Sequence, residues 1–136
     1  MNCVPIGFVS SPYKIRGDAP KQGKLTDEVS IITLDPTYMD AAEGLSIGDD
    51  LFVICWFDRS DRTVLQSRRF GEEKNPLRGV FSTRSPNRPN PIALTLVKLV
   101  HIEGGLLTVK GLEALDQTPV VDIKPYSLSI DTPRND

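Results

Sequence analysis

Proline and glycine are spread so densely along this chain that long helices have little room to form. Eleven prolines and ten glycines fall among its 136 residues. Proline inside a helix removes a backbone hydrogen bond and clashes with the preceding turn. The runs between these breaks are short and rich in branched and aromatic residues, which is typical of strands. The sequence therefore predicts a mostly β protein with many turns.

Eight runs have the composition of strands, and they cover residues 6–9, 29–34, 51–57, 63–66, 80–82, 92–103, 106–115 and 120–126. The run at 51–57 is apolar on both faces, as a central strand is. Asp35 followed by Pro36 is typical of a helix start and Gly44 of a helix end, so one short helix is expected over residues 36–43. Gly104-Gly105 predicts a two-residue hairpin connection. Many short strands with one short helix favour an antiparallel barrel or a sandwich.

Length and composition favour one globular domain over residues 1–136. The chain is 39% hydrophobic and 25% charged, which is ordinary for a soluble protein. Its longest apolar run, the seven residues at 51–57, is much shorter than a membrane span. The N-terminus has no basic start followed by a long apolar core, so we expect no secretory signal and no membrane partner.

The cysteines and the histidine limit the chemistry that the chain can perform. Cys3 and Cys55 do not make a secreted disulfide framework, so a cytoplasmic location is expected. One histidine, His101, with two dispersed cysteines excludes the usual four-ligand zinc site, and we expect no metal. His101 lies in an apolar run, and no Ser-His-Asp or Cys-His set can be assembled around it.

Charge is unevenly distributed along the chain. The net charge is −2, but residues 62–90 carry seven bases against two acids, which leaves nine bases and sixteen acids elsewhere. That segment is therefore +5 and the remainder −7. Such asymmetry indicates an anionic partner. The alternative is a solvated loop whose arginines pair with acids elsewhere. The seven bases are Arg62, Arg68, Arg69, Lys74, Arg78, Arg84 and Arg88.

Residues 78–92 read RGVFSTRSPNRPNPI and form the first candidate site. Three prolines within six residues fix φ and remove backbone donors, which gives a stiff, extended loop. A stiff loop loses little entropy on binding, and this one carries Arg84 and Arg88. A rigid barrel corner with solubilising arginines is the alternative. We favour a binding site, because solubility does not require stiffness.

Residues 112–126 read LEALDQTPVVDIKPY and form the second candidate site. A turn at 116–119 offers backbone groups and the Asp116 carboxylate at the start of a strand. The strand then places Asp122 and Lys124 on one face, with Tyr126 just beyond. An edge strand with a surface ion pair is an equally good interpretation of this segment.

The stretches GVFSTRSPNRPNPIAL and LDQTPVVDIKPY resemble the two signature segments of the TsaA-like family, whose characterised members are TrmO-type tRNA methyltransferases. The opening IGFVSSPYK…APKQG and the run LFVICWFDRS are also similar to that family's pattern, so the resemblance covers nearly the whole chain. It implies a small antiparallel β-barrel that binds S-adenosylmethionine and forms a homodimer. It also implies methylation of the N6 nitrogen of N6-threonylcarbamoyladenosine, next to the anticodon of tRNA on its 3′ side.

The resemblance also implies which residues bind the cofactor, and they come from four segments. Longer relatives have His-Gln in place of Asp58-Arg59 and glycine in place of Ala93 and Gln117, and they carry a second, C-terminal domain. The implied cofactor residues are Pro20, Lys21, Gln22, Asp58, Arg59, Arg84, Leu94, Asp116, Gln117, Thr118 and Pro119.

Methyl transfer from a sulfonium depends more on in-line positioning than on strong acid or base groups. The N6 nitrogen is a poor nucleophile, so an acceptor for its proton is useful, and Asp122 or a backbone carbonyl near Asp116 is expected in that catalytic role. A flipped base is expected to stack on Tyr126 or on an arginine plane. The expected phosphate contacts are Arg68, Arg69, Arg84, Arg88 and Lys124.

Two other functions stay open from the sequence, a small-molecule methyltransferase and a non-catalytic RNA-binding barrel. The homodimer has its own argument, because residues 51–57, with Trp56, need cover on both faces and a barrel interior covers one. A second copy or the helix at 36–43 is expected to cover the other face.

Overall fold

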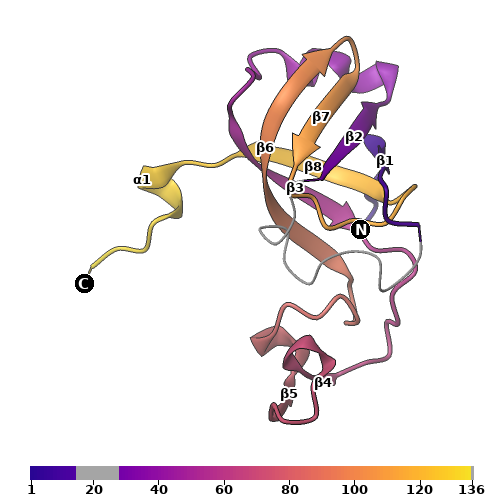
Figure 1. Cartoon of the computed structure of the whole chain (residues 1–136), viewed down its shortest axis with the longest axis vertical. Coiled ribbons are helices and arrows are strands. Elements are labelled where there is room, and N and C mark those ends of the chain that lie inside the picture. The colour runs from indigo at the N-terminus through magenta and orange to yellow at the C-terminus, as the bar shows by residue number, and fades with distance from the viewer. Residues whose placement is uncertain (15–27, 136) are drawn as a thin grey trace.

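Six strands close into an antiparallel barrel in the order β1–β2–β7–β6–β3–β8, with β8 returning to β1 (Figure 1). The structure is a computed structural model that describes residues 1–14 and 28–135. The mostly β fold predicted from the sequence is confirmed, and its main sheet is a barrel and not a sandwich. The barrel strands are β1 (Gly7–Ser10), β2 (Val29–Leu34), β3 (Asp50–Trp56), β6 (Ile92–Glu103), β7 (Leu106–Lys110) and β8 (Pro119–Pro125).

Strict alternation of inward and outward side chains builds the barrel core. In β3 the inward Leu51, Val53 and Cys55 are buried, whereas the outward residues between them are partly exposed. Burying one such aliphatic side chain contributes about 1.5–3 kcal/mol. Gly7 is needed where β1 meets β2, because a Cβ there would overlap the carbonyl oxygen of Thr33. The side chains with no exposed surface are Val9, Ile32, Leu51, Val53, Leu99, Leu107, Val109, Ala114 and Val120.

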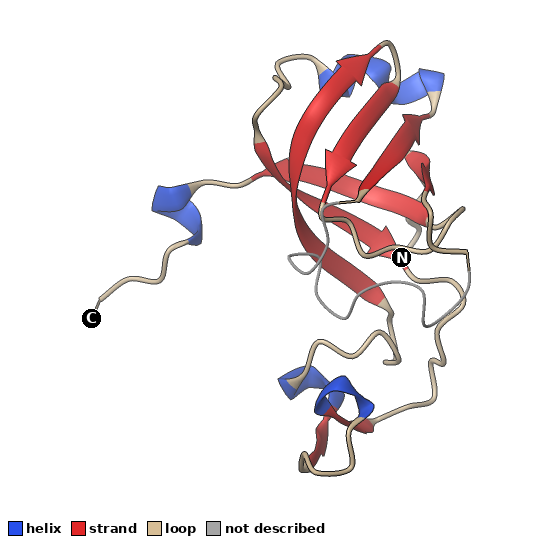
Figure 2. Ribbon diagram, in the orientation of Figure 1, coloured by secondary structure: helices blue, strands red, loops and turns tan. Residues whose placement is uncertain are grey.

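The helix predicted after Asp35 is the 3-10 helix η2 (Pro36–Ala42). The Asp35 carboxylate accepts a hydrogen bond of 2.8 Å from the Thr37 amide, which caps the first turn. The helix lies at one end of the barrel (Figure 2), and Ala42 packs against the core there. It therefore does not cover the outer face of β3, although it was one of the two expected covers.

The segment between β3 and β6 leaves the barrel and forms a separate two-stranded sheet (Figure 1). It contains β4 (Gln66–Arg68), the 3-10 helix η3 (Arg69–Gly71), β5 (Leu77–Gly79) and the 3-10 helix η4 (Val80–Ser82). We call residues 62–90 the basic arm. Its two strands pair with each other and join no strand of the barrel sheet.

Three strand predictions need correction. Residues 80–82 form the helix η4, because Thr83 Oγ1 and Ser82 Oγ donate to carbonyls three residues earlier and tighten the turn. The strand expected at 63–66 begins at Gln66, because the Asp61 carboxylate holds Thr63 in a turn. The strand expected over 106–115 ends at Lys110, because Gly111 turns the chain with φ of +96°. Strand β5 was not predicted.

A short helix, α1 (Leu128–Asp131), follows β8 and was not predicted. Its start is capped by the Ser127 hydroxyl, which accepts from the Ile130 amide. The helix projects away from the barrel (Figure 1) and leaves Leu128 and Ile130 exposed. Within residues 1–14 and 28–135, no helix has the length and apolarity to cross a membrane.

Candidate functional site

Arg59 joins two of the segments that the sequence assigns to the cofactor. Its Nη2 donates to the Asp116 carbonyl oxygen at 2.7 Å and to Thr118 Oγ1 at 3.2 Å. The contact arises because β3 lies beside β8, so the chain leaving β3 passes the turn that leads into β8. Asp58, 3.7 Å from the Arg59 Nε, is exposed beside it. The structure thus brings Asp58–Arg59 and the 116–119 turn together.

Asp116 fixes that turn against the end of β1. Its Oδ1 accepts from the Ser11 amide at 2.9 Å, and its Oδ2 lies 3.1 Å from the Lys14 Nζ. The Ser11 hydrogen bond, and then the Lys14 contact, hold the pKa of this carboxyl below its ordinary value. The carboxylate of Asp116 is thus charged at neutral pH and used for positioning, while its carbonyl faces Arg59.

Gln117 adopts a left-handed backbone conformation with φ of +70°. Its amide donates to the Val9 carbonyl at 2.7 Å, so the turn is held although glycine would suit the conformation better. The Gln117 side chain also lines a surface pocket, so the residue faces a different part of the surface from Arg59.

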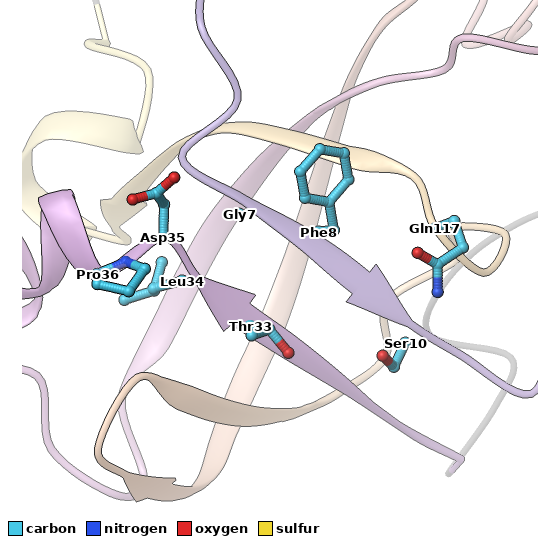
Figure 3. Close-up of a pocket in the computed structure, with 8 residues that line it drawn as sticks. All are labelled: Gly7, Phe8, Ser10, Thr33, Leu34, Asp35, Pro36 and Gln117. Carbon is cyan, nitrogen blue, oxygen red and sulfur yellow. The ribbon is translucent and has the colours of Figure 1, made fainter.

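That pocket lies on the outside of β1 and β2 and has a volume of about 390 Å³ (Figure 3). Phe8 and Gln117 stand over one part of it, and Asp35 and Pro36 border the opposite end. Its size is within the range of small-molecule sites. Apart from Gln117 it contains none of the predicted cofactor residues. Sequence reasoning missed it, because β1 and β2 carry no unusual residue pattern.

Leu94 and Asp122 lie in one row across the outer surface of the barrel. Both are paired with Ile54 of the central strand β3, Leu94 from β6 and Asp122 from β8. Leu94 is 42% exposed, so this row offers an apolar shelf with a carboxylate at its end. The Asp122 Oδ1 accepts from the Ile123 amide at 2.9 Å, and its Oδ2 is 3.1 Å from the Lys124 Nζ. The ion pair of the alternative interpretation is therefore present, but β8 pairs with both β1 and β3 and is not an edge strand.

Two arginines hold the proline-rich loop in place. Arg88 Nη1 donates to the carbonyls of Thr83 and Ser85 at 3.1 and 3.0 Å. Arg62 donates to the Pro89 carbonyl at 2.7 Å and lies over the Trp56 ring at 5.1 Å. Such planar, multi-donor contacts are typical of guanidinium groups. The sequence did not predict that Arg62 binds the loop and packs on Trp56. Its position in the basic segment was the only signal.

The other predicted RNA-binding residues differ in their availability. Arg84 is exposed and makes no hydrogen bond or ion pair with any residue that the structure describes. Arg68 donates to the Asn75 carbonyl at 2.8 Å, and Arg69 stacks over Phe70 at 4.9 Å. The edge of the Tyr126 ring packs against Phe52 with 5.9 Å between centroids. Pro20, Lys21 and Gln22 lie outside the described residues.

Nucleophilic chemistry has little support in the described part of the chain. Cys55 is in the core, where burial and then the charge of Glu113 raise the pKa of its thiol to about 12. His101 is exposed, with its Nε2 3.4 Å from Glu103 Oε2. Among the described residues, no three His, Cys, Asp or Glu side chains are grouped to hold a metal ion. The described polar side chains can bind a ligand, orient it and accept a proton from it.

A family model described as the tRNA-methyltransferase O N-terminal domain matches residues 8–132. This chain belongs to that family. A curated relative from Methanothermobacter thermautotrophicus, named a probable S-adenosyl-L-methionine-binding protein, is 48% identical over 94% of this chain and 91% of its own. An S-adenosyl-L-methionine-binding protein from Archaeoglobus fulgidus is 44% identical over 93% of this chain and 90% of its own.

The fold of the tRNA-methyltransferase O family is also found in solved structures. The crystal structure of TrmO from Pseudomonas aeruginosa matches with a TM-score of 0.78 and 29% identity. The match covers 100% of this chain and 60% of that one, so this chain spans about three fifths of the length of the solved protein.

Proposed function

We propose that this protein is an S-adenosylmethionine-dependent methyltransferase that acts on the N6 nitrogen of N6-threonylcarbamoyladenosine next to the tRNA anticodon. The observation that carries the proposal is the Arg59 contact, which unites the Asp58–Arg59 segment with the 116–119 turn. Membership of the tRNA-methyltransferase O family supports it. We further propose that residues 1–136 act as one domain in the cytoplasm.

The surface around Leu94 suits S-adenosylmethionine. Leu94 and Ile54 offer apolar contact for an adenine ring and a carbon chain, and the Asp122 carboxylate offers a counter-charge to a cation. The names of the two archaeal relatives support this cofactor. When bound, the cofactor would supply a methyl group on a sulfonium sulfur: the N6 nitrogen would bond to the methyl carbon as the carbon–sulfur bond breaks, and the thioether S-adenosylhomocysteine would leave.

The residues of this chain contribute positioning and a proton acceptor. The Arg59 bonds fix the turn, and Asp122 stands at the end of the shelf with 46% of its side chain exposed. A carboxylate there accepts the N6–H hydrogen bond, aims the nitrogen lone pair and takes the proton as the new bond forms. Such positioning is worth up to about 7–11 kcal/mol of barrier in favourable cases.

The basic arm is the proposed contact for the tRNA phosphates. Its charge of +5 contrasts with −7 on the rest of the chain, so an anionic ligand is attracted to the arm and repelled elsewhere. Arg84 is the leading candidate because no described residue occupies its guanidinium. Four phosphate contacts give a slope of about −3 for log affinity against log salt. A flat response to salt would favour a small-molecule substrate.

A second copy of the chain is the proposed cover for the outer face of β3 and β6. Ile92 and Leu96 are exposed there beside Phe52, on either side of the Leu94 cofactor surface, and η2 lies at the barrel end instead. A second copy on this face would therefore border the bound cofactor. Arg62 of the same chain already covers one side of Trp56. Light scattering tests the dimer, and a mass near 15 kDa would refute it. Leu96→Glu then tests the face, because folded monomers are expected from this variant.

The decisive test of function is mass spectrometry of tRNA nucleosides after incubation with the protein and S-adenosylmethionine. The substrate is tRNA that carries N6-threonylcarbamoyladenosine, and the expected product is the same nucleoside with one added methyl group. Asp122→Asn should slow transfer strongly, and Asp131→Asn on α1 is the matched control. Transfer to the free nucleoside alone indicates a small-molecule enzyme. RNA binding without cofactor binding indicates a non-catalytic barrel.

A further inference from the structure

Phe81 is the most exposed aromatic side chain of the basic arm, although it lies within one of the family's signature segments. It is 84% exposed, while its neighbour Val80 is 2% exposed. A single exposed apolar side chain is common on protein surfaces, so the order of the backbone and the charges around Phe81 decide whether it is a binding site.

The local structure holds Phe81 in this position. The Val80 amide donates to the Leu65 carbonyl at 2.9 Å, which ties η4 to the start of the hairpin. The hydroxyls of Ser82 and Thr83 donate to the carbonyls of Gly79 and Val80 at 2.8 and 3.0 Å. Because the backbone on both sides is bonded, the exposed ring is presented by an ordered turn, which lowers the entropy cost of binding.

Two arginines flank the ring in the sequence, each three residues away. Arg78 and Arg84 are both exposed, and neither guanidinium group makes an ion pair or hydrogen bond with a described residue. A protein partner would need carboxylates placed to meet both guanidinium groups. A single-stranded nucleic acid offers a base face with phosphates on each side, so it matches the ring and the two charges together.

We propose that Phe81 is a stacking platform for an unpaired base of the RNA substrate, with Arg78 and Arg84 contacting the phosphates on either side. The proposal rests on the proposed function in taking tRNA as the substrate. It adds a base-binding site that lies on the basic arm. The arm hangs from the barrel (Figure 1), so it can reach into a nucleic-acid loop.

The test measures binding of a fluorescent anticodon stem-loop RNA by anisotropy, without S-adenosylmethionine, so that methyl transfer has no influence on the result. Phe81→Leu keeps the apolar surface and removes the aromatic face, whereas Phe81→Trp keeps the face. Loss of one stacked base should weaken binding about 5- to 150-fold for Phe81→Leu and leave Phe81→Trp near the parent affinity. Leu77→Ala, an exposed apolar change on the same arm, is the matched control and should have little effect.

The arginines have a separate expected result. Arg78→Ala should lower affinity and make the salt dependence shallower by about one contact, and Arg134→Ala in the C-terminal tail should do neither. If Phe81→Leu binds RNA as tightly as the parent, the stacking proposal is wrong. If light scattering shows that Phe81→Ala separates a dimer while Phe81→Leu does not, the side chain serves an interface between copies, which also overturns it. RNA binding that depends on Phe81 without methyl transfer would preserve this proposal and refute the proposed reaction.

Discussion

The barrel and the basic arm are built from the same chain by different kinds of interaction. The barrel buries nine side chains completely and makes its hydrogen bonds along strand ladders. The arm has two three-residue strands and one buried apolar side chain, Val80, which is 2% exposed, and leaves Leu65, Leu77 and Phe81 exposed. It is held by arginine bonds to its own carbonyls and by proline stiffness.

We infer from this difference that the barrel provides stability and the arm provides recognition. An isolated two-stranded hairpin is marginally stable in water, so the arm depends on its attachment and local polar contacts. Substitutions in the arm should therefore change binding with little effect on unfolding, and substitutions in the barrel should do the reverse. The charge division follows the same boundary, with +5 on the arm and −7 on the rest of the chain.

The largest expected effect is a difference in the free energy of unfolding between a leucine of the barrel and a leucine of the arm. Leu107→Ala should lower the free energy of unfolding by about 2–5 kcal/mol, because Leu107 has no exposed surface and the change leaves a cavity. Leu77→Ala, on the exposed side of the arm, should change it by no more than about 0.5 kcal/mol. Urea denaturation measures both. Equal losses would mean that the arm is packed into a core in solution, and the comparison would fail.

The second prediction separates two arginines of the stiff loop. Arg84→Ala should weaken cofactor or tRNA binding at least tenfold, about 1.4 kcal/mol, and leave the melting temperature almost unchanged. Arg88→Ala, in contrast to Arg84→Ala, should loosen the loop itself. It should speed amide hydrogen exchange across residues 83–88, because it removes the bonds to the Thr83 and Ser85 carbonyls. Unaltered binding of both ligands by the Arg84 variant would contradict its role as a site residue.

The smallest expected effect concerns the two non-glycine residues that have a left-handed backbone in the described part of the chain, Gln117 in the barrel rim and Phe70 in the arm. Gln117→Gly should raise the free energy of unfolding by about 0.5–1 kcal/mol, because glycine adopts this conformation without strain. Phe70→Gly should leave it unchanged, because the arm does not belong to the barrel's cooperative unit. A similar gain from both changes in urea denaturation would show that the arm and barrel unfold together.

Much of the barrel was predictable because its signals are local. The strands at 29–34 and 92–103 are found with the predicted bounds. Both runs are rich in branched and apolar residues, which favour strands. The Asp35 cap and the Gly104-Gly105 turn also depend on neighbouring residues alone. The arm was predicted poorly, because at 80–82 short polar side chains compete with the strand pattern.

The sequence by itself determined the β class, the stiff loop and the charge division, because proline, glycine, branched residues and charges act over a few positions. The tertiary structure alone decided that Arg59 meets the 116–119 turn and that Leu94 and Asp122 share a row with Ile54. It also decided that Arg88 is used inside its own loop while Arg84 is available for a ligand. These outcomes depend on strand pairing and register, and residues far apart in the sequence become neighbours only when the barrel closes.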